Sequence, residues 1–365
     1  MRRIAAVVAV ALALLPFGAG AAGAAPVREL QWHLTALGID QAHRLSQGDG
    51  VVVAVIDTGV SPHRDLDGQL LPGKDYEGTT DGREDLDNHG TGVAALIAAR
   101  GGSADRALGI APKAKILPVR ASAALGDSTV DEAIRWATDN GARIINVSSG
   151  GQLPPETIEA VRYAFARDVV VVASAGNVST GGGGILAPAR YPGVLAATAT
   201  DRGGNRWTGA KTGPEVVLSA PGVDITVPSG DERDQYVKVP GGTSASAAIV
   251  AGAAALIRAR FPQAKAPDVV QRLISTADEA GAPGRDPEYG FGRLNLMRAL
   301  TAEVAPVTAN PLGEPRAEPP PAPAARTGSG LSGTTMAVIA AIVIALLVVV
   351  AAAIAVPLWL VTRRR

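Results

Sequence analysis

Short runs of aliphatic residues alternate with helix-like stretches through the middle of this 365-residue chain, and this alternation constrains the fold most. The runs are apolar almost throughout, which indicates strands buried on both faces. Such strands joined by helices form a mostly parallel sheet with helices on both faces, an α/β fold. The predicted strands span residues 51–56, 116–119, 144–147, 169–173, 194–198 and 216–218.

Residues between these runs mark the ends of helices. Ser128 and Thr129 suit the start of a helix that ends at Gly141, and Pro154-Pro155 suits the start of another that ends near Asp168. In sheets of this kind, active sites lie at the carboxyl ends of the strands. Polar residues at those ends are therefore the first candidates for chemistry.

Composition and charge exclude several classes of function. The chain has no cysteine, which excludes disulfides, thiol catalysis and cysteine-ligated metal clusters. It has 34 basic and 34 acidic side chains, but five of the arginines lie at residues 2–3 and 363–365. The rest of the chain is therefore mildly acidic, which argues against nucleic-acid binding, since that needs a basic face. The acidic loop from Asp81 to Asp87 is expected to be solvated rather than a metal site.

The N-terminal 24 residues are predicted to be a secretory signal peptide. Arg2 and Arg3 precede an apolar run, and Ala22-Gly23-Ala24 suits cleavage after residue 24. An uncleaved anchor or a buried helix is the alternative. The run has only about 12 residues, fewer than the ~20 that a membrane-spanning helix needs.

Residues 336–361 contain no charged side chain and are predicted to form a transmembrane helix. A helix of that length would be about 39 Å long, enough to cross a bilayer with some tilt. Arginines in the tail, residues 362–365, place the C-terminus in the cytoplasm and the rest outside. The proline-rich residues 302–335 are predicted to be a linker between this helix and a globular part.

Asp57 and His89 are two candidates for acid–base chemistry. Asp57 directly follows the run at residues 51–56, where a carboxylate is partly desolvated and needs hydrogen bonds or a cation. A turn Asp would have the same context, and an aspartic-protease dyad would need a second D-[ST]-G, which this sequence does not contain. His89 lies where a polar loop becomes an Ala-rich helix, and imidazole is the natural general base at neutral pH.

Ser244 and Asn177 complete the set of candidates. Ser244 follows a glycine turn that opens a second Ala-rich helix, so its hydroxyl would lie near the positive end of that helix. An ordinary N-cap serine has the same context, and Ser246 is a rival nucleophile. Asn177 follows the strand at 169–173, where its amide could stabilise an oxyanion, although turn asparagines are common.

Together these residues resemble the subtilases, the subtilisin-like serine proteases, which have the order Asp-His-Ser. Four motifs carry this resemblance: AVIDTGV, NHGTGVAALIAA, SAGN and GGTSASAA. Within that family the chain is similar to the mycosins, membrane-anchored subtilases associated with type VII secretion. Residues 31–34, 109–121 and 251–262 resemble mycosin sequence, as does the order of signal peptide, catalytic domain, proline-rich linker and span.

The resemblance implies a fold and a set of roles. The fold is a subtilisin-like three-layer α/β catalytic domain over residues 49–301, on which an N-terminal extension, residues 25–48, packs. Asp57 would orient His89, which would take the proton of the nucleophile Ser244. Asn177 would join the Ser244 amide in the oxyanion hole. The substrate would pair with the backbone of Ser148, Ser149 and Gly150 as an added strand.

The implied function is a serine endopeptidase at the outer face of the plasma membrane, held by a single span. Its partners would be a protein or peptide substrate, the membrane and the type VII secretion machinery, with no cofactor. The alternative is a structural subunit that stabilises the secretion complex with little or no proteolysis. Ala248, where the family commonly has a proline, favours that alternative, whereas the presence of Asp57, His89, Ser244 and Asn177 favours the enzyme.

Overall fold

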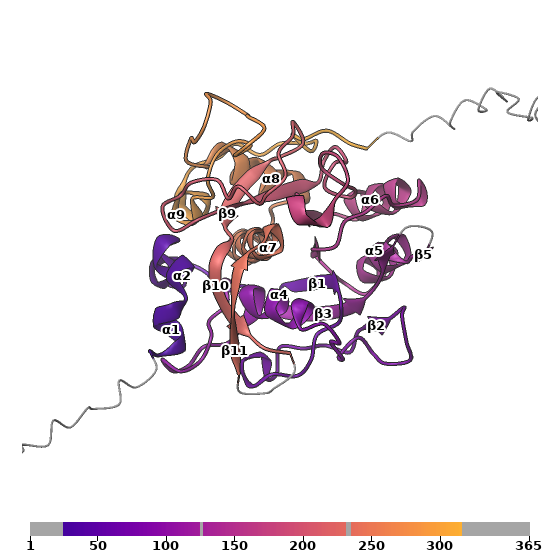
Figure 1. Cartoon of the computed structure of the whole chain (residues 1–365). Helices are drawn as coiled ribbons and strands as arrows, with labels where there is room; N and C mark the ends of the chain where they lie inside the picture. The colour runs from indigo at the N-terminus through magenta and orange to yellow at the C-terminus, as the bar shows by residue number, and fades with distance from the viewer. Residues whose placement is uncertain (1–24, 125–126, 231–234, 316–365) are drawn as a thin grey trace, which may run out of the picture. The chain divides into compact units, whose positions relative to one another are not determined.

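Seven parallel strands form the central sheet of the computed structural model, which describes residues 25–124, 127–230 and 235–315 (Figure 1). Their order across the sheet is β2-β3-β1-β6-β7-β8-β9, and each neighbouring pair is parallel. The strands are β1 (Val52–Asp57), β2 (Lys74–Asp75), β3 (Lys115–Arg120), β6 (Ile144–Val147), β7 (Val170–Ser174), β8 (Leu195–Thr200) and β9 (Leu218–Pro221). The predicted mostly parallel sheet is thus confirmed.

The predicted strands agree with the observed ones to within about two residues, apart from one. β9 begins at Leu218, where the apolar run at residues 216–218 ends. Val216 and Val217 are fully buried, but they lie in the approach to the strand rather than in its regular pairing. Burial alone therefore does not distinguish a strand from the buried segment before it.

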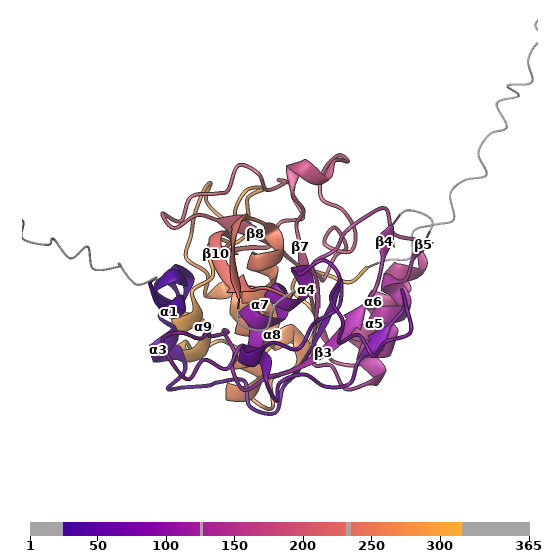
Figure 2. The ribbon, with the colours of Figure 1, turned by 60° about the horizontal axis from the view of Figure 1, so that its bottom comes forward.

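Helices cover both faces of the sheet (Figures 1 and 2). α4 (His89–Ala98) and α7 (Thr243–Arg260) pack together on one face. α5 (Val130–Asp139) and α6 (Glu156–Ala166) lie side by side on the other. The predicted cap of α5 is not formed by the Thr129 side chain, because its hydroxyl accepts from the Ser122 amide instead.

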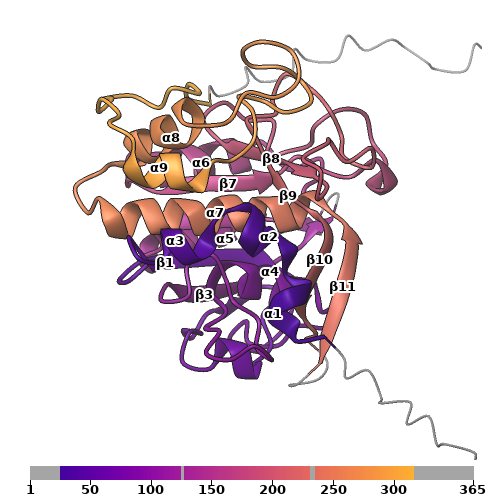
Figure 3. The same cartoon turned by 90° about the vertical axis from the view of Figure 1, so that its left-hand side faces the viewer.

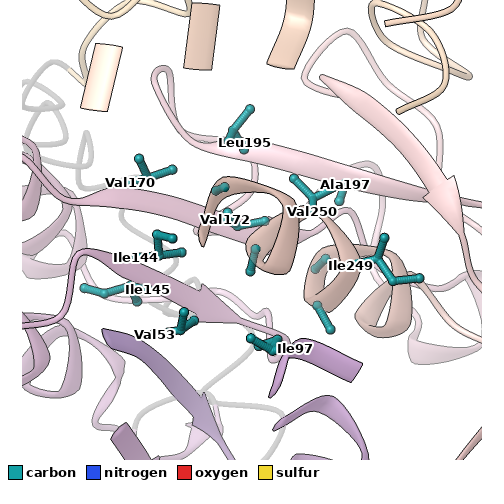
Figure 4. Packing of buried hydrophobic residues seen from close by; sticks show 14 of the residues in the cluster. Val53, Ile97, Ile144, Ile145, Val170, Val172, Leu195, Ala197, Ile249 and Val250 are labelled. Carbon is teal, nitrogen blue, oxygen red and sulfur yellow. The ribbon is translucent and has the colours of Figure 1, made fainter. Parts of the chain in front are cut away.

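Aliphatic side chains of α7 and of the sheet pack together in the core (Figure 4). Ile249 and Val250 of α7 are fully buried, as are the strand residues Ile144, Val172 and Leu195, to within 1%. Burial of each such aliphatic side chain contributes roughly 1.5–3 kcal/mol relative to exposure. This packing fixes the start of α7 relative to the strand ends.

Three short N-terminal helices, α1 (Val27–Leu30), α2 (Trp32–Ala36) and α3 (Ile39–Ala42), pack against the domain (Figure 3). The indole Nε1 of Trp32 donates to the Val223 carbonyl at 3.0 Å. The Gln31 side chain donates to the Leu108 carbonyl and accepts from the Leu108 amide. These long-range hydrogen bonds tie the N-terminal extension to the body of the domain.

The remaining elements surround this framework. α8 (Ala266–Ser275) and α9 (Leu296–Thr301) pack against α7. β10 (Val223–Pro228) pairs with β11 (Tyr236–Gly241), and β4 (Ala123–Ala124) pairs with β5 (Asp127–Ser128), both antiparallel. Two short 3₁₀ helices are η1 (Arg64–Leu66) and η2 (Val178–Thr180).

The predicted signal peptide, span and cytoplasmic tail lie outside the described residues. None of the helices in the described part is long and apolar enough to cross a bilayer. The first part of the predicted linker is described and contacts the domain. There the Asn310 side chain donates to the Gly193 carbonyl at 2.9 Å, and the Val307 amide donates to Asp268 at 2.8 Å.

Candidate active site

The candidate residues come from neighbouring strand ends and from the first turns of two packed helices. Asp57 is the last residue of β1, Ser148 follows β6, and Asn177 lies three residues after β7. These strands are adjacent and parallel, so their carboxyl ends lie at one edge of the sheet. His89 begins α4 and Ser244 lies in the first turn of α7, and these two helices pack against each other.

His89 and Asp57 form a hydrogen-bonded pair. The Nδ1 atom of His89 lies 2.7 Å from Oδ1 of Asp57. The same oxygen accepts from the Thr58 amide at 2.8 Å. The side chain of Asp57 has no exposure, whereas that of His89 is 40% exposed. The carboxylate is therefore shielded from water while the imidazole remains accessible.

Acidic neighbours raise the pKa of His89 to about 9. The charge of Asp57 is the largest cause; burial opposes it, and the hydrogen bond to Asp57 adds to it. The more distant charges of Asp85 and Asp87 also raise the pKa. A neutral imidazole, which is what a general base requires, is therefore the minor form of His89 at neutral pH.

Asp85 holds the start of α4 against the end of β1, a role that the sequence prediction missed. The sequence predicts a solvated loop at residues 81–87, and this prediction is wrong for Asp85, which is only 5% exposed. One of its oxygens accepts from the Thr58 hydroxyl at 2.7 Å, and the other accepts from the amide and hydroxyl of Thr91 at 2.8 and 2.6 Å. The Thr58 hydroxyl also accepts from the Gly90 amide at 3.0 Å.

The spacing of an Asp four residues before a helix-start His could have drawn attention to this role. In a run of four acidic residues, however, no local pattern distinguishes the buried carboxylate from the exposed ones. Asp87, two residues on, is exposed. Asp85 thus links the segments that carry Asp57 and His89.

The two candidate nucleophiles differ in their surroundings. Ser244 is partly exposed. Ser246 has no exposure, and its hydroxyl donates to the Ala220 carbonyl at 2.9 Å. Ser246 is therefore inaccessible to a substrate, which leaves Ser244 as the candidate.

The Ser244 hydroxyl lies beside the end of β6. Its Oγ is 3.4 Å from the carbonyl oxygen of Ser148, which also accepts from the Ser174 hydroxyl at 3.0 Å. The Ser148 hydroxyl accepts from the amide group of Asn146 at 2.9 Å. Strands β6 and β7 thus place the predicted substrate segment next to the candidate nucleophile.

Asn177 is oriented by the residue that precedes Ser244. Its Oδ1 accepts from the amide and the hydroxyl of Thr243, at 3.1 and 3.0 Å. The Thr243 hydroxyl in turn accepts from the Gly176 amide at 3.1 Å. These two bonds fix the orientation of the Asn177 amide. Its Nδ2 group forms no hydrogen bond within the described residues, so it can donate to a ligand. Thr243 was not among the predicted residues.

The segment Ser148–Gly150 has backbone groups available for pairing. β6 ends at Val147, and Gly151 forms an isolated bridge with Ala187. Between them, Ser149 and Gly150 take part in no backbone–backbone hydrogen bond within the described ranges. An extended peptide can therefore add its own hydrogen bonds to this segment.

In the part of the chain that the structure describes, no group of three His, Asp or Glu side chains is placed to hold a metal ion. The chemistry that the arrangement itself offers is proton transfer at His89, a hydroxyl at Ser244 and an amide donor at Asn177. Together these groups suit nucleophilic attack on a carbonyl carbon.

Comparison with known proteins gives matches along most of the chain. Residues 48–292 match the subtilase family. A thermostable alkaline protease from Halalkalibacterium halodurans is 37% identical over 273 residues, 73% of this chain and 73% of the relative. Mycosin-4 from Mycobacterium tuberculosis is 35% identical over 333 residues, 78% of this chain and 72% of the relative.

A solved structure gives the same result. It is described as the serine protease MycP1, an essential component of the type VII (ESX-1) secretion system. It is 30% identical to this chain, with a TM-score of 0.68, and the match covers 76% of this chain and 90% of that one. The family match spans all four of Asp57, His89, Asn177 and Ser244.

Proposed function

The chain belongs to the subtilase family and is a serine endopeptidase related to the mycosins, and from this premise we propose that it cuts peptide bonds through Asp57, His89 and Ser244. The observation that carries the assignment is the 2.7 Å bond between His89 and the fully buried Asp57. This bond holds the Nδ1 side of the imidazole, so the other ring nitrogen is available for proton transfer.

The first half of the reaction forms an acyl-enzyme. His89, in its neutral form, removes the proton of the Ser244 hydroxyl as Oγ bonds to the scissile carbonyl carbon. The resulting imidazolium gives this proton to the amide nitrogen as the C–N bond breaks, so the amine product leaves neutral. Asp57 fixes the tautomer of the neutral imidazole and stabilises the imidazolium that forms from it. Asp57 does not take the proton itself.

Negative charge develops on the carbonyl oxygen in this step and needs donors already in place. Nδ2 of Asn177 is one donor, because Thr243 occupies the other end of that amide. The Ser244 backbone amide, in the first turn of α7, is the second. Water then attacks the acyl carbon with His89 as base, which releases the acid product and restores Ser244.

The substrate is an extended peptide. Its backbone pairs with Ser148, Ser149 and Gly150, of which Ser149 and Gly150 take part in no backbone–backbone hydrogen bond within the described residues. Hydrogen bonds to the main chain bind different sequences equally, so this segment supplies affinity and alignment rather than selectivity.

A fluorophosphonate probe tests the assignment directly, because it labels a serine activated by a neighbouring base. We expect the wild-type chain to be labelled and Ser244→Ala to be unlabelled. Ser246→Ala is the matched control, since Ser246 lies in the same helix but its hydroxyl is buried. Labelling of Ser244→Ala would reject Ser244 as the nucleophile. So would a result in which a folded Ser246→Ala variant loses labelling while Ser244→Ala keeps it.

The proposal includes anchoring in the plasma membrane, with residues 336–361 as the span and the catalytic domain outside. It rests on the 26 uncharged residues and the arginines that follow them. A chain that ends at residue 335 should leave the membrane fraction, and the full chain should require detergent for extraction. Recovery of both chains in the same soluble fraction would contradict the anchor.

We also propose that the chain associates with type VII secretion machinery. The proposal is supported by its similarity to MycP1, which is described as an essential component of the type VII (ESX-1) secretion system. This association supports a second candidate function, a structural subunit of the complex. Ser244→Ala separates the two functions because it removes the nucleophile and leaves the surface unchanged. If secretion continues with Ser244→Ala but stops on deletion of the gene, the chain has a structural role beside proteolysis.

A further inference from the structure

A buried lysine lies beside the proposed oxyanion donor. Asn177 and Ala210 form an isolated antiparallel bridge, and the Lys211 amide donates to the Gly176 carbonyl at 2.9 Å. Lys211 is only 6% exposed. Its methylene groups lie 3.2–4.0 Å from the point where a Cβ at Gly176 would be. The lysine side chain therefore extends along the glycine that precedes Asn177.

The ammonium group reaches the glycine-rich segment at residues 181–184. Nζ donates to the Gly181 carbonyl at 2.6 Å. Within the described residues this is its one hydrogen bond, and no carboxylate lies at ion-pair distance from it. An ammonium has three donors, and a buried charge is costly unless an opposite charge accompanies it. Two of the three ammonium donors therefore have no protein partner within the described residues.

The same segment joins the ammonium to the substrate-pairing residues. Nζ lies 3.8 Å from the Cβ position of Gly182, and a methyl carbon of Leu186 lies 3.6 Å from that position. Leu186 also lies 3.8 Å from the Cβ position of Gly150, and the next residue accepts the Gly151 amide at 3.0 Å. These contacts thus link the Lys211 side chain to the segment that would hold the substrate backbone and to the glycine before the amide that would hold its carbonyl.

Glycines leave room around this ammonium. At Gly181, Gly183 and Gly184 an added Cβ would meet no atom within 4 Å, and at Gly182 it would meet Leu186 and Nζ at ordinary contact distance. Space is therefore open beside three of the four glycines in the segment that the ammonium group reaches.

We propose that Lys211 selects a substrate with an acidic side chain, Asp or Glu, in the residue that precedes the scissile bond. This inference rests on the proposed function. The carbonyl of that residue is the group that Asn177 polarises, so its side chain is nearest to residues 176–182. A carboxylate there accepts hydrogen bonds from the two unused donors of the ammonium and brings an opposite charge next to it. An uncharged amide of the same size supplies no charge.

Quenched peptides that differ only in the residue before the cut test this selectivity, with Glu, Gln, Leu and Lys at that position. We expect kcat/KM for the Glu peptide to exceed that for the Gln peptide by about 10- to 100-fold, the range for a charge-assisted hydrogen bond in a site built for it. Lys211→Met keeps an unbranched side chain and should reduce this ratio to near one. Lys238→Met should preserve the ratio, because Lys238 is an exposed lysine of β11 that pairs with Asp224.

A binding measurement separates this inference from the proposed function. Fluorescence anisotropy of the Glu and Gln peptides on the Ser244→Ala chain tests recognition without turnover and needs no change at Lys211. Equal binding and equal cleavage of the two peptides would overturn the selectivity assigned to Lys211 and leave the protease intact. Tighter binding of the Glu peptide, lost in Ser244→Ala/Lys211→Met, supports Lys211 even if the fluorophosphonate probe rejects Ser244.

Discussion

The imidazole of His89 is 40% exposed, yet it is bonded through Nδ1 to a carboxylate, Asp57, with no exposure at all. A charge pair with a buried partner is screened much less than a fully exposed pair. Asp57 therefore acts strongly on the imidazole and, with the more distant acidic groups, raises the pKa of His89 to about 9. In the proposed reaction the accessible side of the ring would meet the substrate, while the side bonded to Asp57 sets the proton affinity of the imidazole.

The first prediction concerns the pH dependence of catalysis. Proton removal from Ser244 requires neutral His89, so kcat/KM should rise with pH and level off above a midpoint near 9. The profile of kcat/KM with an uncharged peptide substrate reports this pKa of the free enzyme. A midpoint at about 6.5, the ordinary value for histidine, would contradict the structural pairing.

Asp57→Asn should reduce kcat/KM by about 10⁴-fold, the size of the loss in kcat for the same change in a chymotrypsin-type triad, because the amide favours the wrong tautomer of His89. It should also shift the pH midpoint of kcat/KM below 9, since the largest cause of the raised pKa is removed. Asp49→Asn, an exposed partner of Lys113, is the control and should change neither quantity. A similar loss in both variants would indicate an effect that is not specific to the site.

Asp85→Asn and Asp87→Asn separate a charge effect from a structural one. Both carboxylates raise the pKa of His89, so either change should lower the pH midpoint. Only Asp85 is buried and accepts hydrogen bonds from Thr58 and Thr91. Asp85→Asn should therefore also cost about 1–3 kcal/mol of unfolding free energy, because a buried group loses a partner.

Chemical denaturation of the two variants measures the stability difference, and kcat/KM profiles measure the midpoints. Asp87→Asn should unfold with the wild type, since surface substitutions change stability by less than about 0.5 kcal/mol. If both variants are equally destabilised, the hydrogen bonds of Asp85 do not fasten α4 to β1.

The sheet could be predicted from sequence because its strands are apolar along their whole length. Six predicted runs correspond to six strands, and β2, with only Lys74 and Asp75, has no apolar pattern to find. The start of β9 was misplaced because residues 216 and 217 are as buried as the strand that they precede. Periodicity reports burial, and burial extends beyond regular hydrogen bonding.

The candidate site could be predicted from sequence only in part. Residues in distinctive local settings, such as Asp57 after a buried run and Ser244 at a glycine turn, could be proposed from sequence. Supporting residues could not, because their roles depend on neighbours far away in the chain. Thr243 contacts Asn177 across 66 positions, and Lys211 contacts Gly181 across 30. An Asp, Thr or Lys carries no local signal of such a partner.

Asn177→Ala should lower kcat by about 10²- to 10³-fold with little change in KM, the effect measured for an oxyanion-hole asparagine in a subtilisin. Thr243→Val should also lower kcat with little change in KM, but by a smaller factor. The backbone amide of residue 243 still donates to Oδ1 of Asn177 in this variant. Steady-state kinetics on one peptide give both constants. A rise in KM with unchanged kcat would instead assign Asn177 to ground-state binding of the substrate.

The last prediction concerns a buried cation on the far end of α7. Arg258 is 4% exposed, and its guanidinium donates to the Asp168 carboxylate at 3.1 Å. Asp168 is about a quarter exposed, has a φ of 62° and also pairs with Arg143 at 2.9 Å. The two partners are thus unequal: the arginine depends on Asp168 for its charge balance, whereas Asp168 has both water and Arg143.

This inequality predicts which substitution is worse. Asp168→Asn keeps a residue type that tolerates positive φ but leaves the guanidinium buried without its counter-charge, so we expect a loss of about 3 kcal/mol in unfolding free energy. Arg258→Met removes the buried charge itself and should cost only about 1 kcal/mol. Denaturant titration of the two single variants measures both losses. Equal losses, or a larger one for Arg258→Met, would mean that packing of the arginine stem rather than its charge dominates at this position.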